Sequence, residues 1–138
     1  MNLPLADNGL PFMAGSLVVS QESIETQRET LKDFLHALIR GWSDAIAEPE
    51  EAARLAVEDF GADLGLDPPE KENRQAEEQI SLVSTEETDA DGLLTMSETL
   101  MQQNVEALAD AGFDLTVEDC FDASLLEEVY AEHPPELL

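Results

Sequence analysis

The sequence predicts a mainly α-helical protein with one or two β-strands. Apolar residues recur at intervals of three and four along several segments, as they do on the buried face of a helix. Residues that favour helix ends bound these segments, and only one short β-branched run lies between turn formers. The length of 138 residues suits a single region, residues 1–138, with a hydrophobic core of its own.

Residues 1–20 are predicted to form a loop followed by one buried strand. Prolines and glycines recur along residues 4–15 and favour turns over regular structure. The run Ser-Leu-Val-Val-Ser at 16–20 then brings β-branched residues between polar ones.

Helices are predicted at about residues 27–47, 49–60, 70–83, 97–111 and 124–132. The first has the clearest pattern, because its apolar residues share one face: Leu31, Phe34, Leu35, Leu38, Ile39, Trp42 and Ile46. The stretch at 84–92 is predicted to be an acidic loop that links two helices.

Several residues mark the predicted helix ends. Capping boxes are expected for three pairs: Thr26 with Glu29, Thr95 with Glu98, and Ser124 with Glu127. Pro49 suits a first helical turn, where its missing amide hydrogen costs nothing. Gly61 and Gly112 are expected just past helix ends, and Phe113 is expected to close a Schellman motif after Gly112.

The charge balance is strongly acidic, with 32 Asp and Glu against 6 Lys and Arg, a net charge of −26. All six bases lie between Arg28 and Arg74, so residues 75–138 hold 17 acids and no base. Nucleic acids and anionic membranes attract clusters of Lys and Arg side chains. This sequence has no such cluster, so neither is expected as a partner. One interpretation is adaptation to high salt, and the other is an ordinary acidic protein.

No apolar run approaches the roughly 18 residues of a membrane span, so direct membrane insertion is not expected. The first residues lack the basic region of a signal peptide, so no signal peptide is expected in this chain. His36, Cys120 and His133 have no metal-ligand spacing, and hydrolase, phosphate-loop and dinucleotide motifs are absent from the sequence. We therefore expect no enzyme, no cofactor and no metal.

One stretch of the sequence resembles a calcium-binding loop. Residues 87–98, Glu-Thr-Asp-Ala-Asp-Gly-Leu-Leu-Thr-Met-Ser-Glu, place Asp89, Asp91 and Glu98 at ligand positions of a twelve-residue loop. The first position, however, is Glu87, where the shorter Asp is nearly always found. A plain acidic loop is the preferred interpretation.

Residues 9–56 resemble the thiamine-precursor and alkanesulfonate-type substrate-binding proteins of ABC importers. Members of that family have a loop and strand, a short acidic helical turn, a long helix ending in Gly-Trp, and a Pro-Glu-Glu-Ala helix start. The corresponding residues are 17–19, 34–38, Gly41-Trp42 and 49–52. Later in the chain, residues 92–96 and Gly112-Phe113 match a Gly-containing loop and a Gly-Phe region of the family.

The resemblance implies a C-terminal fragment of an α/β fold of the periplasmic-binding-protein type II kind, since family members are more than twice as long. It also implies a small organic ligand between two lobes, an ABC permease partner and an extracytoplasmic location for the full-length protein. Phe12, Met13 and Gly15 are the residues expected to approach the ligand. The alternative is an acidic helical interaction protein or a calcium-responsive protein.

Overall fold

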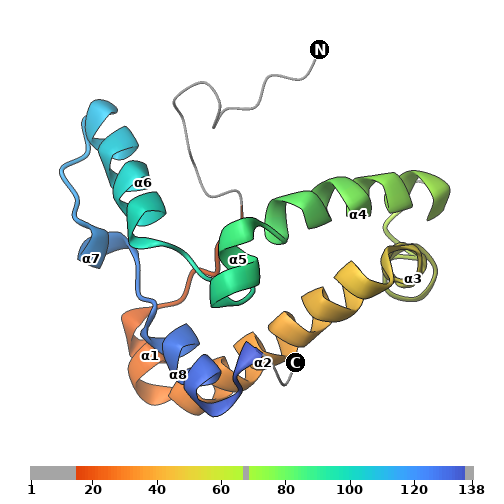
Figure 1. The fold of residues 1–138 in the computed structure, drawn as a ribbon, viewed down its shortest axis with the longest axis horizontal. Helices are drawn as coiled ribbons and strands as arrows, with labels where there is room; N and C mark the ends of the chain where they lie inside the picture. The colour runs from red at the N-terminus through yellow and green to blue at the C-terminus, as the bar shows by residue number, and fades with distance from the viewer. Residues whose placement is uncertain (1–14, 67–68, 136–138) are drawn as a thin grey trace.

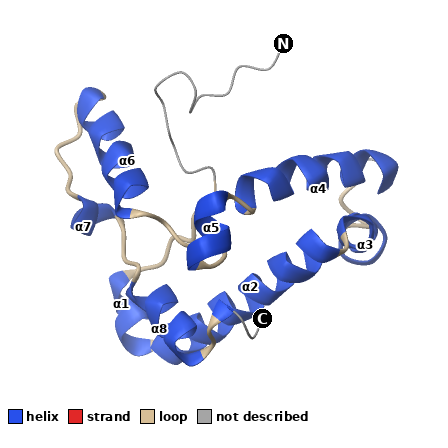
Figure 2. Cartoon of the chain, in the orientation of Figure 1, coloured by secondary structure: helices blue, strands red, loops and turns tan. Residues whose placement is uncertain are grey.

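The computed structural model describes residues 15–66 and 69–135, and this part of the chain is helical with no strand (Figure 2). The elements in chain order are α1 (Gln21–Thr26), α2 (Arg28–Ala47), α3 (Pro49–Arg54), the π-helix η2 (Leu55–Phe60), α4 (Pro69–Val83), α5 (Glu86–Asp91), α6 (Glu98–Asp110), α7 (Val117–Cys120) and α8 (Ser124–Glu132). The mainly α prediction is therefore confirmed, whereas the α/β fold implied by the resemblance stays a prediction.

The strand predicted at residues 17–19 is wrong. Residues 15–20 have no regular structure, and Val18 is 90% exposed. A strand is stabilised by hydrogen bonds to a neighbouring strand, and the described residues contain none to pair with it. Instead this segment leads into α1, where the Ser20 hydroxyl accepts a hydrogen bond from the Ser23 amide at 3.1 Å.

The long amphipathic helix α2 is the centre of the packing. Its Ile39 is completely buried, and α8 lies beside the first half of α2 (Figure 1). Leu125 and Val129, one turn apart on α8, are buried as well. Phe34, predicted on the buried face of α2, is instead half exposed, because that face is wider than the helices packed on it.

A second packing unit forms at the other end of α2. The chain turns at Pro49, which occupies the first turn of α3 as predicted, and α3 packs on both α2 and α4. In Figure 1, α2 and α4 run back from α3 as two arms. Ala53 is buried at their junction, whereas Phe60, the last residue of η2, is 83% exposed.

Two short helices, α5 and α7, lie where no helix was predicted. Each has a capping box in which a threonine and the residue three positions later cap one another. The pairs are Thr85 with Thr88 and Thr116 with Asp119. The predicted acidic loop at 84–92 is therefore largely a helix.

The three predicted capping boxes are all wrong. Thr26 ends α1, and its hydroxyl donates to the Glu22 carbonyl at 2.6 Å. Ser97, not Thr95, caps α6 by accepting from the Leu100 amide. The helix α8 follows Ala123 and has no side-chain cap.

The two predicted glycine helix ends differ in outcome. Gly112 has φ +93°, and the Phe113 and Gly112 amides donate to the Leu108 and Ala109 carbonyls, so the Schellman motif is confirmed. Gly61 has φ −113° and is not a left-handed cap. It is buried, and a Cβ there would meet the Ala56 carbonyl, so close approach is the reason for glycine.

Candidate ligand-binding cleft

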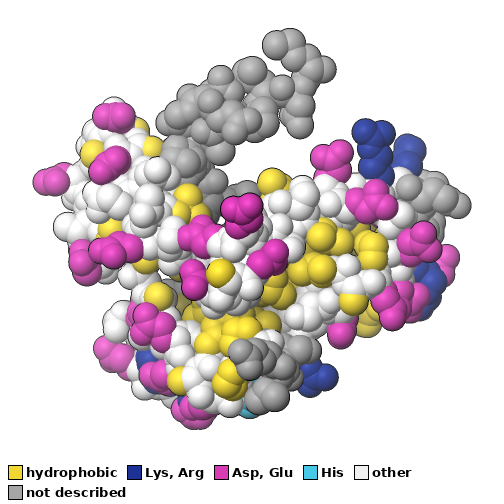
Figure 3. Space-filling model, viewed as in Figure 1, with side chains coloured by type: hydrophobic (Ala, Val, Ile, Leu, Met, Phe, Trp, Pro, Cys, Tyr) yellow, Lys and Arg dark blue, Asp and Glu magenta, His cyan; other side chains and the backbone are white. Residues whose placement is uncertain are grey.

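A mostly apolar cleft of about 390 Å³ lies where α2, α3 with η2, and α4 meet. Figure 3 shows hydrophobic side chains gathered between α2 and α4. The lining residues are Leu38, Gly41, Trp42, Ala45, Ala52, Ala53, Ala56, Glu72, Gln75, Ala76, Gln79 and Ile80. This volume falls in the range of pockets that hold small organic molecules.

Helical spacing explains how the cleft is built. On α2, the positions 38, 41, 42 and 45 step by three, one and three, and therefore share one face. On α4, the positions 72, 75, 76, 79 and 80 do the same. Six of the twelve described lining residues are glycine or alanine, which leave open space where larger side chains would have closed the junction.

The polar groups of the cleft all come from α4. Among the lining residues that the structure describes, Glu72 is the one charged side chain and none is Lys or Arg. Gln75 and Gln79 offer amide groups that both donate and accept hydrogen bonds. Trp42, partly exposed, offers an indole face. The cleft therefore suits a flat, polar, uncharged or cationic molecule better than an anion.

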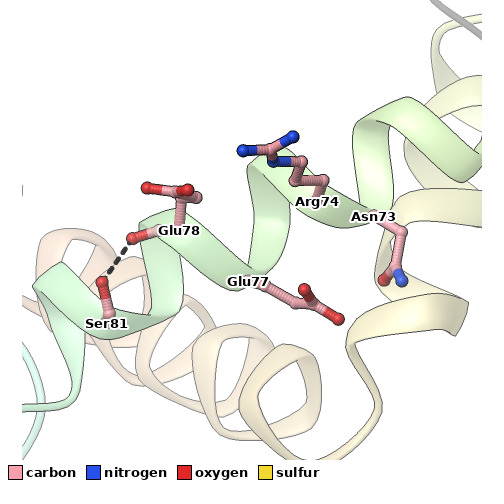
Figure 4. Close-up of a pocket in the computed structure, with 5 residues that line it drawn as sticks. All are labelled: Asn73, Arg74, Glu77, Glu78 and Ser81. Atoms are coloured by element: carbon pink, nitrogen blue, oxygen red, sulfur yellow. Dashed lines mark hydrogen bonds between the residues drawn. The ribbon is translucent and has the colours of Figure 1, made fainter. Parts of the chain in front are cut away.

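A second hollow lies on α4 alone and is lined by Asn73, Arg74, Glu77, Glu78 and Ser81. The Ser81 hydroxyl donates to the Glu78 carbonyl at 2.7 Å (Figure 4). Arg74 and Glu78 point to one side of the helix, and Asn73 and Glu77 point to the other (Figure 4). The described lining comes from a single helix, so no second element closes over a ligand and this hollow is the surface of α4.

Of the predicted ligand residues, Gly15 is not among the described residues that line this cleft. Phe12 and Met13 lie outside the described residues. Gly15 is exposed, with no atom within 4 Å of the place a Cβ would take. Trp42, predicted to fill the core, lines the cleft instead. One signal in the sequence could have located the cleft. Glycine and alanine recur at helical spacing along the predicted helices 27–47 and 49–60, and small side chains on facing helices leave open space.

The structure removes the basis for a calcium loop. Glu87, Asp89 and Asp91 belong to α5, and residues two apart on a helix point to different sides. Across residues 15–66 and 69–135, no group of three or more His, Cys, Asp or Glu side chains is placed to hold a metal ion. Residues 86–91 therefore do not have the conformation of a calcium loop in this structure.

The described lining of the cleft presents apolar surface, two amides and one carboxylate, groups that suit contact with a small polar molecule. The family model described as "NMT1/THI5 like" matches residues 2–52. This match confirms, over that part of the chain, the resemblance to thiamine-precursor and alkanesulfonate-type substrate-binding proteins. Proteins of this family are typically extracytoplasmic and bind small molecules.

No curated protein and no solved structure matches the chain. Among the described residues, no helix has both the length and the apolar character needed to cross a membrane.

Proposed function

We propose that the chain is part of a solute-binding protein that captures a small organic ligand for an ABC importer and performs no covalent chemistry. The observation that carries this proposal is an overlap. The family match at residues 2–52 includes Leu38, Gly41 and Trp42, which form one wall of the cleft. The ABC permease partner and the extracytoplasmic location of the full-length protein belong to the same proposal.

Between the two ligand types of the family, the lining favours a thiamine pyrimidine precursor over a sulfonate. An aminopyrimidine ring is flat and can stack on Trp42 while its nitrogens bond to the amides of Gln75 and Gln79. A sulfonate would bring a permanent negative charge beside Glu72, with no Lys or Arg in the lining to balance it.

The cleft surrounds a ligand from one side only. Solute-binding proteins close two lobes over a ligand, and burial of most of its surface supplies much of the affinity. We therefore expect weak binding by this chain, in the range of about 0.1–1 mM. Tighter binding is expected when a second lobe is supplied by a longer chain. Phe12, Met13 and Gly15 are proposed to add contacts there.

The test uses Trp42, the sole tryptophan, as a fluorescent reporter in the cleft wall. Titration with a hydroxymethyl aminopyrimidine is expected to change its emission to saturation, while an alkanesulfonate is not. Gly41→Leu should abolish the change, because a leucine there projects into the cleft and no atom lies within 4 Å to clash with its Cβ.

Gly41→Ala is the matched control. Alanine adds one methyl group and favours the helix by about 0.5–1 kcal/mol, so this variant should be slightly more stable and still bind. Unchanged binding by Gly41→Leu would exclude this cleft as the site. Equal binding of the sulfonate would contradict the proposed ligand class.

A further inference from the structure

A polar seam joins α2 to α8, which lie far apart in the sequence and side by side in the fold. We define this polar seam by three residues of α2 and by three at the end of the chain: Arg28, Lys32, His36, Glu128, Glu132 and His133. The α2 members are spaced by four residues and so lie on one face of the helix.

Ion pairs hold the first part of the seam. The Arg28 guanidinium donates to the Glu128 carboxylate from Nη2 at 2.6 Å and from Nε at 3.1 and 3.2 Å, and Nη2 also donates to the Ser124 hydroxyl at 3.0 Å. The Lys32 ammonium lies 2.7 Å from Glu132, 3.2 Å from Glu29 and 3.7 Å from Glu128. Lys32 is itself buried, so the seam closes over its charge.

The only two histidines of the sequence end the seam. The rings of His36 and His133 stack with their centroids 3.9 Å apart and 13° between their planes. His133 directly follows α8, and its backbone amide still donates to the Val129 carbonyl. The stack therefore binds the end of α8 to the middle of α2.

We propose that this histidine stack makes the docking of α8 on α2 depend on pH. Histidine is the side chain that ordinarily gains a proton between pH 5 and 8. Two neutral rings, or one neutral and one charged ring, stack without repulsion. Protonation of both rings places two like charges 3.9 Å apart and opposes the stack.

The charges inside the seam, rather than the acidic surroundings, give the direction of the effect. Within the seam at neutral pH, Arg28 and Lys32 face Glu128 and Glu132 from α8, and Glu29 adds one more carboxylate on α2. These groups already pair with one another. Two further positive charges would then leave the seam with more cations than carboxylates.

Other charges also lie on the elements packed against α2. On α2 itself, Asp33 and Arg40 flank His36 by three and four positions with opposite charges. From α1, Glu22 and Glu25 lie beside the start of α2. From α3, Glu50 and Glu51 lie beside its far end, where Arg54 pairs with Glu51.

Release of α8 would reach the candidate cleft. The face of α2 that α8 helps to bury contains Ile39, which is adjacent in the sequence to Leu38 of the cleft wall. Loss of α8 would expose Ile39 and Val129 and loosen that wall. The pH dependence of α8 docking does not require any ligand in the cleft. It is therefore tested separately from the proposed function.

Hydrogen exchange of backbone amides in the full chain tests the proposal. Protection of α8 relative to α6, which contains no histidine, should fall by roughly fivefold or more between pH 7.5 and 5.0. The double variant His36→Phe, His133→Phe keeps two stacked rings without a titrating group and should keep a constant ratio.

A constant ratio in the unaltered protein would overturn the proposal, as would an unchanged pH dependence in the phenylalanine variant. Should the phenylalanine variant fail to dock α8 at pH 7.5, His36→Gln with His133→Gln replaces it. The expected result for that pair is again a protection ratio that does not change with pH.

Discussion

At the scale of single residues, a close contact between Gly92 and Tyr130 joins the end of α5 to α8. Gly92 is buried with φ +105°, and a Cβ there would meet the ring and the hydroxyl of Tyr130. The same hydroxyl donates to the Leu93 carbonyl at 2.8 Å. Burial raises the pKa of the Tyr130 phenol, so it stays the protonated donor well above neutral pH.

Gly92→Ala should therefore destabilise the fold more than Gly112→Ala. Both glycines have a positive φ, which costs an alanine about 1 kcal/mol or more, and Gly92, with ψ 154°, lies in a region that essentially only glycine adopts, at a cost of about 1–3 kcal/mol. At Gly112 no atom lies within 4 Å of the new Cβ, whereas at Gly92 the Tyr130 ring must move, which costs about 1–3 kcal/mol more. Urea denaturation of the two variants measures the difference, and equal losses would contradict this role of Tyr130.

At the scale of elements, a helix typically begins after the last residue that still has an extended backbone, and this residue is its cap. Ser97 has φ −69° and ψ 151° and caps α6, although the pattern of Thr95 and Glu98 predicted a different start. Ser124 matches a capping box in sequence, but its hydroxyl accepts a hydrogen bond from Arg28 of α2. A hydroxyl can bond to a local amide or to a distant donor, and the tertiary structure decides which.

The pairing of α2 with α8 should also respond to acid. Hydrogen bonds from Arg28 lower the pKa of Glu128, so the folded state binds its proton less readily than the unfolded state. The stability from this carboxylate is therefore present above its ordinary pKa near 4.5 and is lost as pH falls through the lowered value.

Glu128→Gln should melt at a lower temperature than the unaltered protein at pH 7, and the gap should shrink as pH falls from about 5 to 3. Thermal melts across this range measure the gap. Glu127→Gln, an exposed neighbour on the same helix, is the control and should show little difference at any pH. A gap that stays constant down to pH 3 would mean that the ion pair with Arg28 does not stabilise the fold.

At the scale of the whole molecule, unbalanced negative charge dominates. Within the described residues, Arg28, Lys32 and Arg54 are each bound to two or more acidic side chains or hydroxyls. These pairs involve a minority of the 32 acids. Most carboxylates therefore face other carboxylates across solvent and repel one another at low salt.

Added salt should stabilise the protein. Raising sodium chloride from about 0.1 to 1 M shortens the Debye length from about 10 to about 3 Å, which screens repulsion among exposed carboxylates. The same salt weakens the few surface ion pairs, but they are outnumbered. The melting temperature should rise across this range, and a flat or falling value would contradict the high-salt interpretation.

The positions of most helices could be predicted from local sequence patterns. The apolar spacing and the breakers Pro49 and Gly112 are local signals, and α2, α4, α6 and α8 begin and end within one residue of the ranges they predicted. The family resemblance predicted for residues 9–56 was also recognisable from sequence alone, since the family model matches residues 2–52. Local patterns suffice for these features because each helix satisfies its own backbone hydrogen bonds.

Three features depend on tertiary packing and could not be predicted from local sequence: the unpaired segment at 17–19, the cleft and the polar seam. A strand needs a partner, and the described residues supply none to residues 17–19. The cleft depends on how α4 returns past α2, and the stack of His36 on His133 depends on α8 docking from the other end of the chain. Contacts between residues this far apart follow from packing, which no local pattern encodes.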